Sequence, residues 1–440
     1  MALDFLILYE HVVREYESLL LLQEELRRRG YTAEIRQLLD RKKWKYFTWK
    51  KPAVLVASNL YDDEGLNSHV YNNVGRCDKV VNLHWEQMLS DTQEAEEWFN
   101  FGGNAKKCVQ TCWGEKTRQR LIEHGVPPEN APVTGAIMMD FLRPEWKGYY
   151  LAKEALCQKY GLDSQKQLWL YISSFGYASM NDSEVAELSA MAGTDFAPFA
   201  AVNRSSMEQT LAWFDAFLTT HPEVELVYRR HPSEWASPAL TALAEKHPHF
   251  HVIFEEGVQQ WITAADATFI WMSTAIAEVY FAGKQCHILR PEPIPHEFDP
   301  VIYKDACCIA NYEEFKQVAE ALAAGKAAET DEVFPIEPDV IEGYFAPGEK
   351  PAYIRMADLL EQVRNEPPRT RPFDEAFTPK FNWLKYFALW GVHIFHALRF
   401  NPARFSAFAG RIYGYVHKAW LPQKKKKAMR EKIQKFMPHR

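Results

Sequence analysis

The chain has 440 residues, and its 47% hydrophobic and 25% charged residues are ordinary for a globular protein with a large core, so we expect two or three domains. Seven cysteines without a CxxC pair argue against a disulfide framework or a zinc site and favour a reducing compartment. A net charge of −7 and the lack of a nucleic-acid-binding motif disfavour nucleic acid as a partner. No uncharged apolar stretch reaches the ~20 residues of a membrane span, and the N-terminus lacks the basic region of a signal peptide, so we expect a cytoplasmic protein.

The first third of the chain alternates between apolar runs typical of strands and longer stretches typical of helices. Strands are expected at residues 5–9, 32–36, 53–58, 79–83, 108–111 and 132–135. Helices are expected at residues 15–29, 66–74 and 115–123. This alternation predicts a parallel, doubly wound α/β sheet in an N-terminal acceptor domain over residues 1–145.

A second alternating series begins after a helical passage at residues 145–161. Its strands are expected at residues 168–172, 224–228, 251–254 and 286–289, with a buried strand also ending before Ser273. Its helices are expected at residues 207–221, around Trp261, after Ser273, and at 312–324 and 352–364. The series predicts a Rossmann-like donor domain over residues 146–365, facing the first domain across a cleft. A proline-rich linker at 366–379 and a helical tail at 380–440 follow.

Polar residues follow the buried strands of the second half. Arg229, Arg230, His231 and Pro232 come after the strand at 224–228, at the end where open α/β sheets bind their ligands. Ser273 and Thr274 stand between a strand and a helix, where a hydroxyl caps the helix and free N–H groups attract an anion. The two segments predict a phosphate cradle without a glycine-rich loop. Ser173, Ser174 and Glu278 complete the predicted donor-binding set. The alternative is that Ser273 is only a cap and His231 only a turn residue.

An acidic loop, Asp62-Asp63-Glu64, follows the strand at 53–58. Adjacent carboxylates repel one another unless they are solvated or share a cation or a proton, so one of them is a candidate general base. Asp63 is the first choice and Glu64 the second. The alternative is an acidic N-terminus that favours the following helix through its dipole. Further candidates at the same edge of the sheet are Glu10 as a catalytic acid and His11, Trp85 and Glu86 as acceptor or cleft residues.

Several common catalytic motifs are missing from the sequence. There is no G-x-G-x-x-G after the first strand, no Walker loop and no G-x-S-x-G elbow. There is also no Asp-x-Asp in either half, which favours chemistry without a metal or another cofactor. The remaining pattern suits a transferase: basic and hydroxyl side chains neutralise a departing nucleotide phosphate, and a carboxylate deprotonates the acceptor hydroxyl.

The segments Asp63-Glu64-Gly65, His231-Pro232 and Ser273-Thr274 resemble the acidic-acidic-Gly, His-Pro and Ser-Ser/Thr motifs of bacterial sialyltransferases and related CMP-Kdo transferases of the GT-B fold. The N-terminal LYEH and HWEQ segments and the stretch from Trp113 to Asp140 resemble bacterial surface-carbohydrate biosynthesis proteins. The likeness covers most of residues 1–365. It implies that His231, Ser273 and Thr274 bind the phosphate of a CMP-activated sugar and that the acidic motif supplies the base. The implied acceptor is a capsular or lipopolysaccharide-type polysaccharide or glycolipid.

Two other functions remain open at this point. A CDP-glycerol- or CDP-ribitol-type polyol phosphotransferase resembles the chain in its His-Pro and Ser-Thr units, but needs a second cluster of basic residues. A non-catalytic scaffold of a polysaccharide assembly complex is the alternative of a different class. The sequence leaves the stereochemistry of transfer open. It also leaves open which of the three adjacent carboxylates acts as base or nucleophile.

The tail is basic and aromatic. Residues 380–440 carry 14 basic side chains and one acid, a balance of +13, whereas residues 1–379 carry 37 basic and 57 acidic side chains, a balance of −20. Residues 381–420 hold 12 aromatic side chains and no acid. This pattern predicts interfacial helices on anionic lipid and a peripheral location on the inner face of the cytoplasmic membrane. The alternative is helices packed against the body with a solvated basic end.

Overall fold

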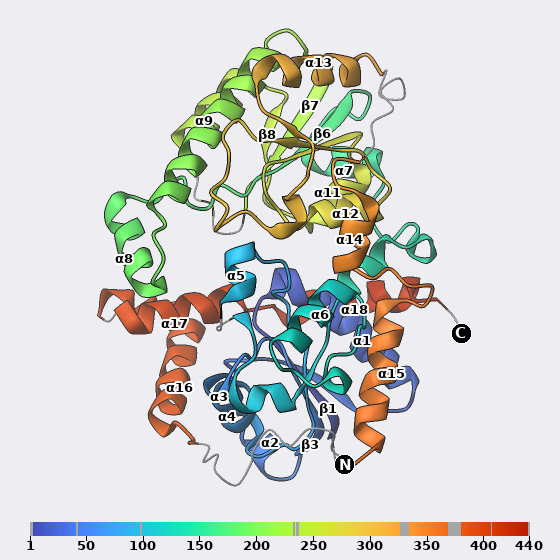
Figure 1. The fold of residues 1–440 in the computed structure, drawn as a ribbon, viewed down its shortest axis with the longest axis vertical. Helices are drawn as coiled ribbons and strands as arrows, with labels where there is room; N and C mark the ends of the chain where they lie inside the picture. Colours follow the sequence, from blue (N-terminus) through green and yellow to red (C-terminus); the bar gives the residue numbers. More distant parts are fainter. Residues whose placement is uncertain are drawn as a thin grey trace. The chain divides into compact units, whose positions relative to one another are not determined.

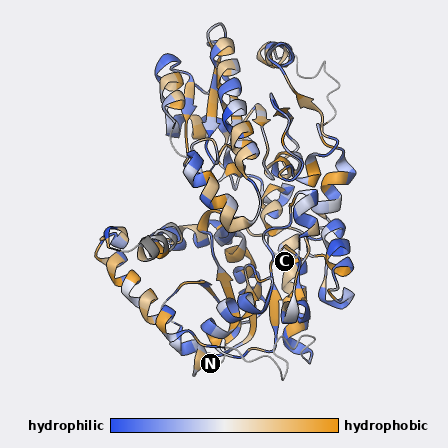
Figure 2. Cartoon of the chain, turned by 60° about the vertical axis from the view of Figure 1, so that its left-hand side comes forward, coloured by the Kyte–Doolittle hydropathy of each residue, from blue (hydrophilic) through white to orange (hydrophobic). Residues whose placement is uncertain are grey.

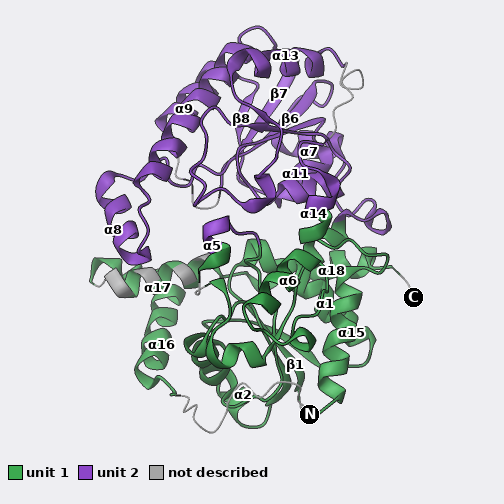
Figure 3. Cartoon of the chain, in the orientation of Figure 1, with its two compact units in different colours: residues 1–87, 94–141, 342–440 green, residues 88–93, 142–341 purple. Residues whose placement is uncertain are grey.

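The computed structural model describes residues 3–40, 43–96, 99–231, 234, 237–325, 334–367, 380–405 and 407–438. Backbone contacts group the chain into two compact units (Figure 3). Unit 1 comprises residues 1–87, 94–141 and 342–440, and unit 2 comprises residues 88–93 and 142–341. This grouping differs from the sequence-based limits at 145 and 365, because the helices after residue 342 return to unit 1. Most of the predicted linker, residues 368–379, lies outside the described residues.

Unit 1 is built on a parallel sheet with the strand order β2-β1-β3-β4-β5 (Figure 1). Its strands are β1 (Leu3–Tyr9), β2 (Ala33–Gln37), β3 (Pro52–Ala57), β4 (Val80–Asn82) and β5 (Val109–Gln110). The inner strand β1 is buried at all but one position, as expected for an apolar run covered on both faces. The strand order reverses between β1 and β3, which makes their carboxyl ends the topological switch point of this sheet.

Helices cover both faces of this sheet. They are α1 (Glu17–Arg28), α2 (Trp44–Phe47), α3 (Asp63–Gly65), α4 (Asn72–Val74), α6 (Glu115–Glu123) and α15 (Ala352–Asn365), with π-helical turns at Val12–Tyr16 and Leu66–Tyr71. A short helix, α5 (Asp91–Ala95), begins in unit 2 and ends in unit 1. The leucines at 19–22 and 26 are buried, and Gly30 follows α1 with a φ of +88°, a left-handed conformation that favours glycine. Asp140 accepts hydrogen bonds from the backbone N–H groups of Ala352 and Tyr353 and so caps α15.

Unit 2 has a parallel sheet with the order β11-β10-β9-β6-β7-β8. Its strands are β6 (Gln167–Ile172), β7 (Val224–Arg229), β8 (Phe250–Val252), β9 (Ala267–Ile270), β10 (Cys286–Leu289) and β11 (Cys308–Ile309). Counted from β6, this is the 3-2-1-4-5-6 order of a Rossmann sheet, and its switch point lies between β6 and β9. Aromatic side chains fill the core, where Trp169 stacks on Phe217 at 5.0 Å between ring centroids.

The helices of unit 2 surround this sheet. They are α7 (Lys153–Tyr160), α8 (Asp182–Ala192), α9 (Ala197–Leu218), α10 (Pro238–Lys246), α11 (Val258–Ala264), α12 (Ile276–Phe281), α13 (Tyr312–Ala323) and α14 (Pro338–Tyr344), the last of which runs into unit 1. Asn181 caps α8 by accepting from the Glu184 N–H, while the Glu184 carboxylate accepts from the Asn181 N–H. This reciprocal pair is a capping box.

The C-terminal residues form α16 (Trp383–Ala397), α17 (Ala407–Lys418) and α18 (Gln423–Phe436). The last helix packs against α1: Arg430 Nε donates to Glu24 Oε1 at 3.0 Å, and Ile433 is fully buried. Packing against the body, one of the two alternatives for the tail, therefore describes α18. No helix in the described part of the chain has the length and apolar character to cross a membrane.

Some predicted elements differ from the structure in extent. Residues 132–135, predicted as a strand, form only a single parallel bridge between Cys112 and Val133. The helix expected at 207–221 begins ten residues earlier, at Ala197. The helix expected after Ser273 begins at Ile276. These differences lie at element ends, where short apolar runs and cap residues leave sequence patterns ambiguous.

Candidate functional site

The switch point of the unit 2 sheet is bordered by Ser173, which follows β6, and Ser273, which lies beyond the end of β9. Both belong to the predicted donor-binding set. Ligands of doubly wound sheets bind outside the carboxyl ends of the strands at such a point. The strand order thus brings together two segments that are 100 residues apart in sequence.

Ser173 is buried and belongs to a hydrogen-bonded cluster with Tyr228 and Glu234. Its Oγ donates to Glu234 Oε2 at 2.5 Å, and Tyr228 OH lies 2.8 Å from both Ser173 Oγ and Glu234 Oε1. The backbone N–H of His231 donates to Glu234 Oε2 at 3.3 Å. Burial raises the pKa of Glu234, and its hydroxyl partners act in the opposite direction. The cluster fixes the turn that carries His231, so Ser173 is a positioning residue in this structure.

The adjacent arginines at the end of β7 have different surroundings. Arg229 is buried, and its guanidinium donates to the backbone carbonyls of Phe254, Glu255 and Glu256. Burial lowers the pKa of Arg229 to about 10. Arg230 is partly exposed; one Nη donates to the Glu234 carbonyl at a long 3.4 Å, and its Nε has no hydrogen-bond partner among the described residues. Arg230 is therefore the arginine of this pair with donors left for a ligand.

The other predicted donor-binding residues surround the same edge. Ser174 Oγ is buried without a hydrogen-bond partner, and Thr274 is exposed. Partial desolvation lowers the pKa of His231, whose outer face is exposed, so the imidazole is neutral at pH 7. Pro232 lies outside the described residues.

Ser273 shapes the turn that leads into α12. Its Oγ accepts from the Ala275 N–H at 3.3 Å, and Tyr303 OH contacts both the Ser273 N–H and carbonyl. The N-cap residue of α12 is Ala275. Ser273, two residues earlier, shapes the turn before the helix and is not the N-cap that we expected. Glu278, in α12, is partly buried and accepts from Gln259 Nε2 at 3.4 Å. Burial raises the pKa of Glu278 to about 7, against the opposing effect of Gln259.

The switch point of the unit 1 sheet lies between Glu10, after β1, and Ser58, after β3. Glu10 Oε1 accepts from Ser58 Oγ at 3.1 Å and lies 2.9 Å from His69 Nε2. His69 Nδ1 lies 3.1 Å from both the Gly65 carbonyl and Ser68 Oγ, so hydrogen-bonding groups hold the ring at both nitrogens. Burial opposes ionisation of Glu10, but His69 and Ser58 outweigh it and lower the Glu10 pKa. The carboxylate is 28% exposed, so Glu10 is ionised, oriented through one oxygen and open to solvent.

The three acids of the predicted base motif have separate local roles. Asp62 caps α3 by accepting from the Gly65 N–H at 2.7 Å. Asp63 Oδ1 accepts from the backbone and side-chain N–H groups of Asn104 at 2.9 and 3.1 Å. A Cβ at Gly103 would lie 2.8 Å from the same oxygen, so Asp63 fits closely against this loop. Glu64 is exposed.

The acceptor or cleft residues lie along the same edge of unit 1. His11 is exposed, Trp85 is buried against Trp113, and the exposed Glu86 accepts from Tyr61 OH at 3.1 Å. Two neighbours were not predicted. His84 is buried with a φ of +50°, which is rare outside glycine and is often found at functional sites. Arg120 is 6% exposed, and its guanidinium nitrogens have no hydrogen-bond partner in the described part of the chain, although Glu94 lies 3.7 Å away.

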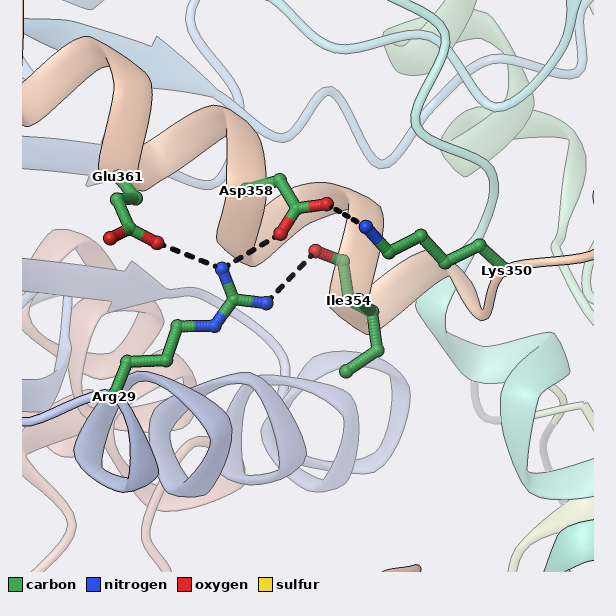
Figure 4. Close-up of a pocket in the computed structure, with 5 residues that line it drawn as sticks. All are labelled: Arg29, Lys350, Ile354, Asp358 and Glu361. Carbon is green, nitrogen blue, oxygen red and sulfur yellow. Dashed lines mark hydrogen bonds and ion pairs between the residues drawn. The ribbon is translucent and has the colours of Figure 1, made fainter. Parts of the chain in front are cut away.

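A surface hollow of about 550 Å³ lies between α1 and α15. Figure 4 shows Arg29 reaching from α1 toward Asp358, Glu361 and the Ile354 carbonyl, while Lys350 pairs with Asp358. The charges of this hollow satisfy one another, so it holds the two helices together and offers no unpaired group to a ligand.

Among the described ranges, no group of three or more His, Cys, Asp or Glu side chains is arranged to hold a metal ion.

Comparisons with known proteins identify the class of fold. No family model and no curated protein sequence matches the chain. Solved structures match it as a two-domain, GT-B-type α/β fold. The UDP-GlcNAc 2-epimerase of Neisseria meningitidis, bound to UDP-GlcNAc, has a TM-score of 0.52 and 11% identity, over 82% of this chain and 100% of that chain.

Two further structures match at a similar level. The UDP-GlcNAc 2-epimerase of Methanocaldococcus jannaschii, in complex with UDP-GlcNAc and UDP, has a TM-score of 0.50 and 10% identity, over 82% of this chain and 100% of that chain. The wall teichoic acid polymerase TagF, soaked with CDPG, has a TM-score of 0.50 and 9% identity, over 82% of this chain and 88% of that chain. At these identities the likeness establishes the fold alone.

Two residues at the switch points were missed by sequence reasoning. His69 lies in the helical segment after the acidic loop, 59 residues from its partner Glu10. Glu234 closes the polar run after β7 and supports the His231 turn. No spacing in the sequence identifies the contact of His69 with Glu10 or that of Glu234 with Ser173. The residues of each pair lie close together because of the strand order of their sheet.

Proposed function

We propose that the chain is a metal-independent glycosyltransferase that moves a sugar from a CMP-activated donor to a surface polysaccharide or glycolipid. The proposed sugar is a 2-keto-3-deoxy acid such as Kdo. The observation that carries the proposal is the placement of complementary groups at the two switch points. Unit 1 has an ionised, oriented carboxylate there, and unit 2 has unpaired donors suited to a phosphate.

In this reaction unit 2 binds the nucleotide. Ser174 Oγ, Arg230 and His231 offer hydrogen-bond donors to the phosphate, and Thr274 adds an exposed hydroxyl. Such donors stabilise the negative charge that develops on the phosphate as the sugar departs. Glu278, partly buried in α12, is proposed to accept hydrogen bonds from ribose hydroxyls, a role that acidic residues take in other Rossmann sheets.

Unit 1 supplies the base. Glu10 takes the proton of the acceptor hydroxyl as that oxygen forms a bond to the anomeric carbon, and the bond from this carbon to the phosphate oxygen breaks with its electrons on CMP. Because Ser58 and His69 hold Oε1, the second oxygen is the one free to act. Asp63 and Glu64 then have structural and solvent-exposed roles beside this base.

The charge at the unit 2 edge favours a donor with a single phosphate. Arg229 is fully occupied by three backbone carbonyls, and Arg290, after β10, pairs with both carboxylate oxygens of Asp299. Arg230, with a single long hydrogen bond of 3.4 Å, is the arginine that keeps donors for a ligand. One such arginine suits a monophosphate better than a diphosphate. The small number of basic side chains with donors left for a ligand also disfavours a polyol phosphotransferase, which needs a further basic cluster. The TagF likeness keeps that activity as the second candidate.

The test is donor turnover by the full chain without added metal. CMP release from CMP-Kdo, corrected for spontaneous breakdown, is compared with CMP release from CDP-glycerol and UDP release from UDP-GlcNAc. We expect turnover of CMP-Kdo that depends on Glu10. Turnover of CDP-glycerol alone would favour the polyol route, and turnover of UDP-GlcNAc alone would contradict a CMP-sugar donor. No turnover and no nucleotide binding would favour the scaffold.

A further inference from the structure

We propose that the hairpin of α16 and α17 docks onto an anionic lipid surface and holds the protein there. The proposal is independent of the reaction above. It concerns a surface of unit 1 outside the candidate catalytic and donor-binding residues, so either proposal can fail while the other stands.

One side of α16 exposes large apolar side chains to solvent, and Figure 2 shows the hydrophobic colour along this helix. Exposure reaches 83% for Leu384 and 71% for Leu398. The residues recur every three or four positions, so they form one continuous stripe on a helix with 3.6 residues per turn. We call them the apolar stripe: Trp383, Leu384, Phe387, Trp390, Ile394 and Leu398. Continuous apolar patches of this kind mark interaction surfaces, whereas single exposed apolar residues do not.

The opposite side of the hairpin is attached to the body of unit 1. Leu389 and Val392 of α16 are buried with Val416 of α17. His393 Nε2 lies 2.9 Å from the Leu39 carbonyl, and the Asn382 N–H donates to Asn72 Oδ1 at 3.1 Å. The helix therefore has its own buried face, and the apolar stripe is a second apolar face that the protein leaves uncovered.

The residues around the stripe are basic. No Asp or Glu occurs between residues 380 and 430. Arg399 and Arg404 follow the stripe in the chain and are exposed, and Arg399 stands just after α16 in a left-handed turn with a φ of +55°. An apolar stripe beside exposed cations matches a lipid surface, in which acyl chains lie beneath anionic headgroups.

The same charges disfavour a second copy of this chain as the occupant. Two hairpins packed stripe to stripe would bring cations of like sign together, and like charges at an interface oppose association. The stripe also holds two tryptophans, a residue type that favours the boundary between lipid and water. Because no described helix is long and apolar enough to cross a membrane, the hairpin is proposed to lie in the plane of the surface.

The experiment measures co-sedimentation of the full chain with two kinds of vesicle. One is phosphatidylcholine alone, and the other contains roughly a third phosphatidylglycerol as the anionic lipid. The double variant Leu384→Glu/Phe387→Glu is compared with Met191→Glu, which changes an 81% exposed apolar residue of α8 in unit 2. We expect the wild type to bind the anionic vesicles, the double variant to lose about tenfold or more in affinity, and Met191→Glu to bind as the wild type does. Circular dichroism and thermal unfolding check that each variant is folded.

A charge variant, Arg399→Gln/Arg404→Gln, tests the charges separately and is expected to reduce the preference for anionic vesicles. The proposal is overturned if no vesicle binds, or if the double variant binds as well as the wild type. It is also overturned if binding depends only on the exposed lysines 424, 425 and 427 of α18. Light scattering that finds a dimer, dissociated by the double variant, would assign the stripe to a second copy instead.

Discussion

The Glu10 carboxylate and the His69 imidazole are 2.9 Å apart at the switch point of the unit 1 sheet, although 59 residues separate them in sequence. The imidazole nitrogen and Ser58 Oγ both contact the same carboxylate oxygen. One oxygen of Glu10 is therefore anchored while the side chain keeps 28% exposure. The pair explains how a partly buried carboxylate stays ionised.

We predict that Glu10→Gln lowers kcat for sugar transfer by about 10²- to 10⁴-fold, the usual effect of losing a general base. The substitution keeps the size of the side chain, so nucleotide affinity and the thermal unfolding temperature should change little. Glu64→Gln is the matched control, because Glu64 is an exposed acid of the originally favoured motif. Equal losses in both variants, or a loss confined to Glu64→Gln, would remove Glu10 from the mechanism.

Substitutions of Arg229 and Arg230 should have different effects, the first on the stability of the protein and the second on nucleotide binding. Arg229→Met removes a buried guanidinium that donates to three backbone carbonyls and should lower the free energy of unfolding by about 1–3 kcal/mol. Arg230→Met should leave stability nearly unchanged and weaken CMP binding at least about tenfold, the effect of one lost charged hydrogen bond. Urea unfolding and calorimetry on both variants measure the two effects. The reverse assignment would show that Arg229 is the ligand-binding arginine.

The protonation of His231 should couple nucleotide binding to pH. Partial desolvation lowers the His231 pKa in the free protein, whereas a bound phosphate stabilises the imidazolium and raises it. Binding therefore takes up a proton between the two pKa values, and affinity should rise by up to about tenfold per unit as pH falls through that window. Because the nucleotide phosphate also titrates near pH 6, CMP affinities are compared with those of His231→Asn at each pH. Identical pH profiles for the two proteins would rule out this coupling.

Replacing Glu278 should stabilise the protein, and the gain should depend on pH. Its carboxyl has a pKa of about 7 in the folded chain against 4.5 for an ordinary glutamate. Between these values the folded state holds a proton that the unfolded state has released, so stability falls as pH rises through this window. Glu278→Gln should then stabilise the protein by about 1–2 kcal/mol near pH 8, less than the full shift because the side chain is partly exposed.

The gain from Glu278→Gln should vanish below about pH 4.5, where both states of the wild type are protonated. Thermal unfolding at the two pH values measures this difference. The same variant should bind CMP more weakly if Glu278 contacts the ribose. An equal gain at both pH values would mean that the carboxyl is not the cause.

The fold was largely predictable because its strands are buried on both faces. Uninterrupted apolar runs such as the one in β1 identify such strands, and the alternation with helices identifies two doubly wound sheets. Residues 132–135 show the limit: their composition suits a strand, yet only Val133 makes a bridge, because pairing depends on a neighbour that the sequence does not specify.

The candidate site was predictable as a set of segments, but not as a set of contacts. The structure places Glu10 and Ser173 at the switch points of the two sheets, as expected for polar residues that follow strands. Sequence alone does not distinguish Arg229 from Arg230, since their difference depends on which one meets the carbonyls of residues 254–256. It also favours Asp63 over Glu10, because three adjacent acids attract attention while the Asn104 contact that occupies Asp63 is formed only in three dimensions.

The most direct test of the proposed function is a calorimetric titration of the full chain with CMP, CDP and UDP, without added metal. The account predicts that CMP binds more tightly than the two diphosphates, and that Arg230→Met and His231→Asn weaken this binding while Glu64→Gln does not. Tighter binding of UDP or CDP, or CMP binding that is unchanged in both donor-site variants, would contradict a CMP-sugar site at the switch point of unit 2.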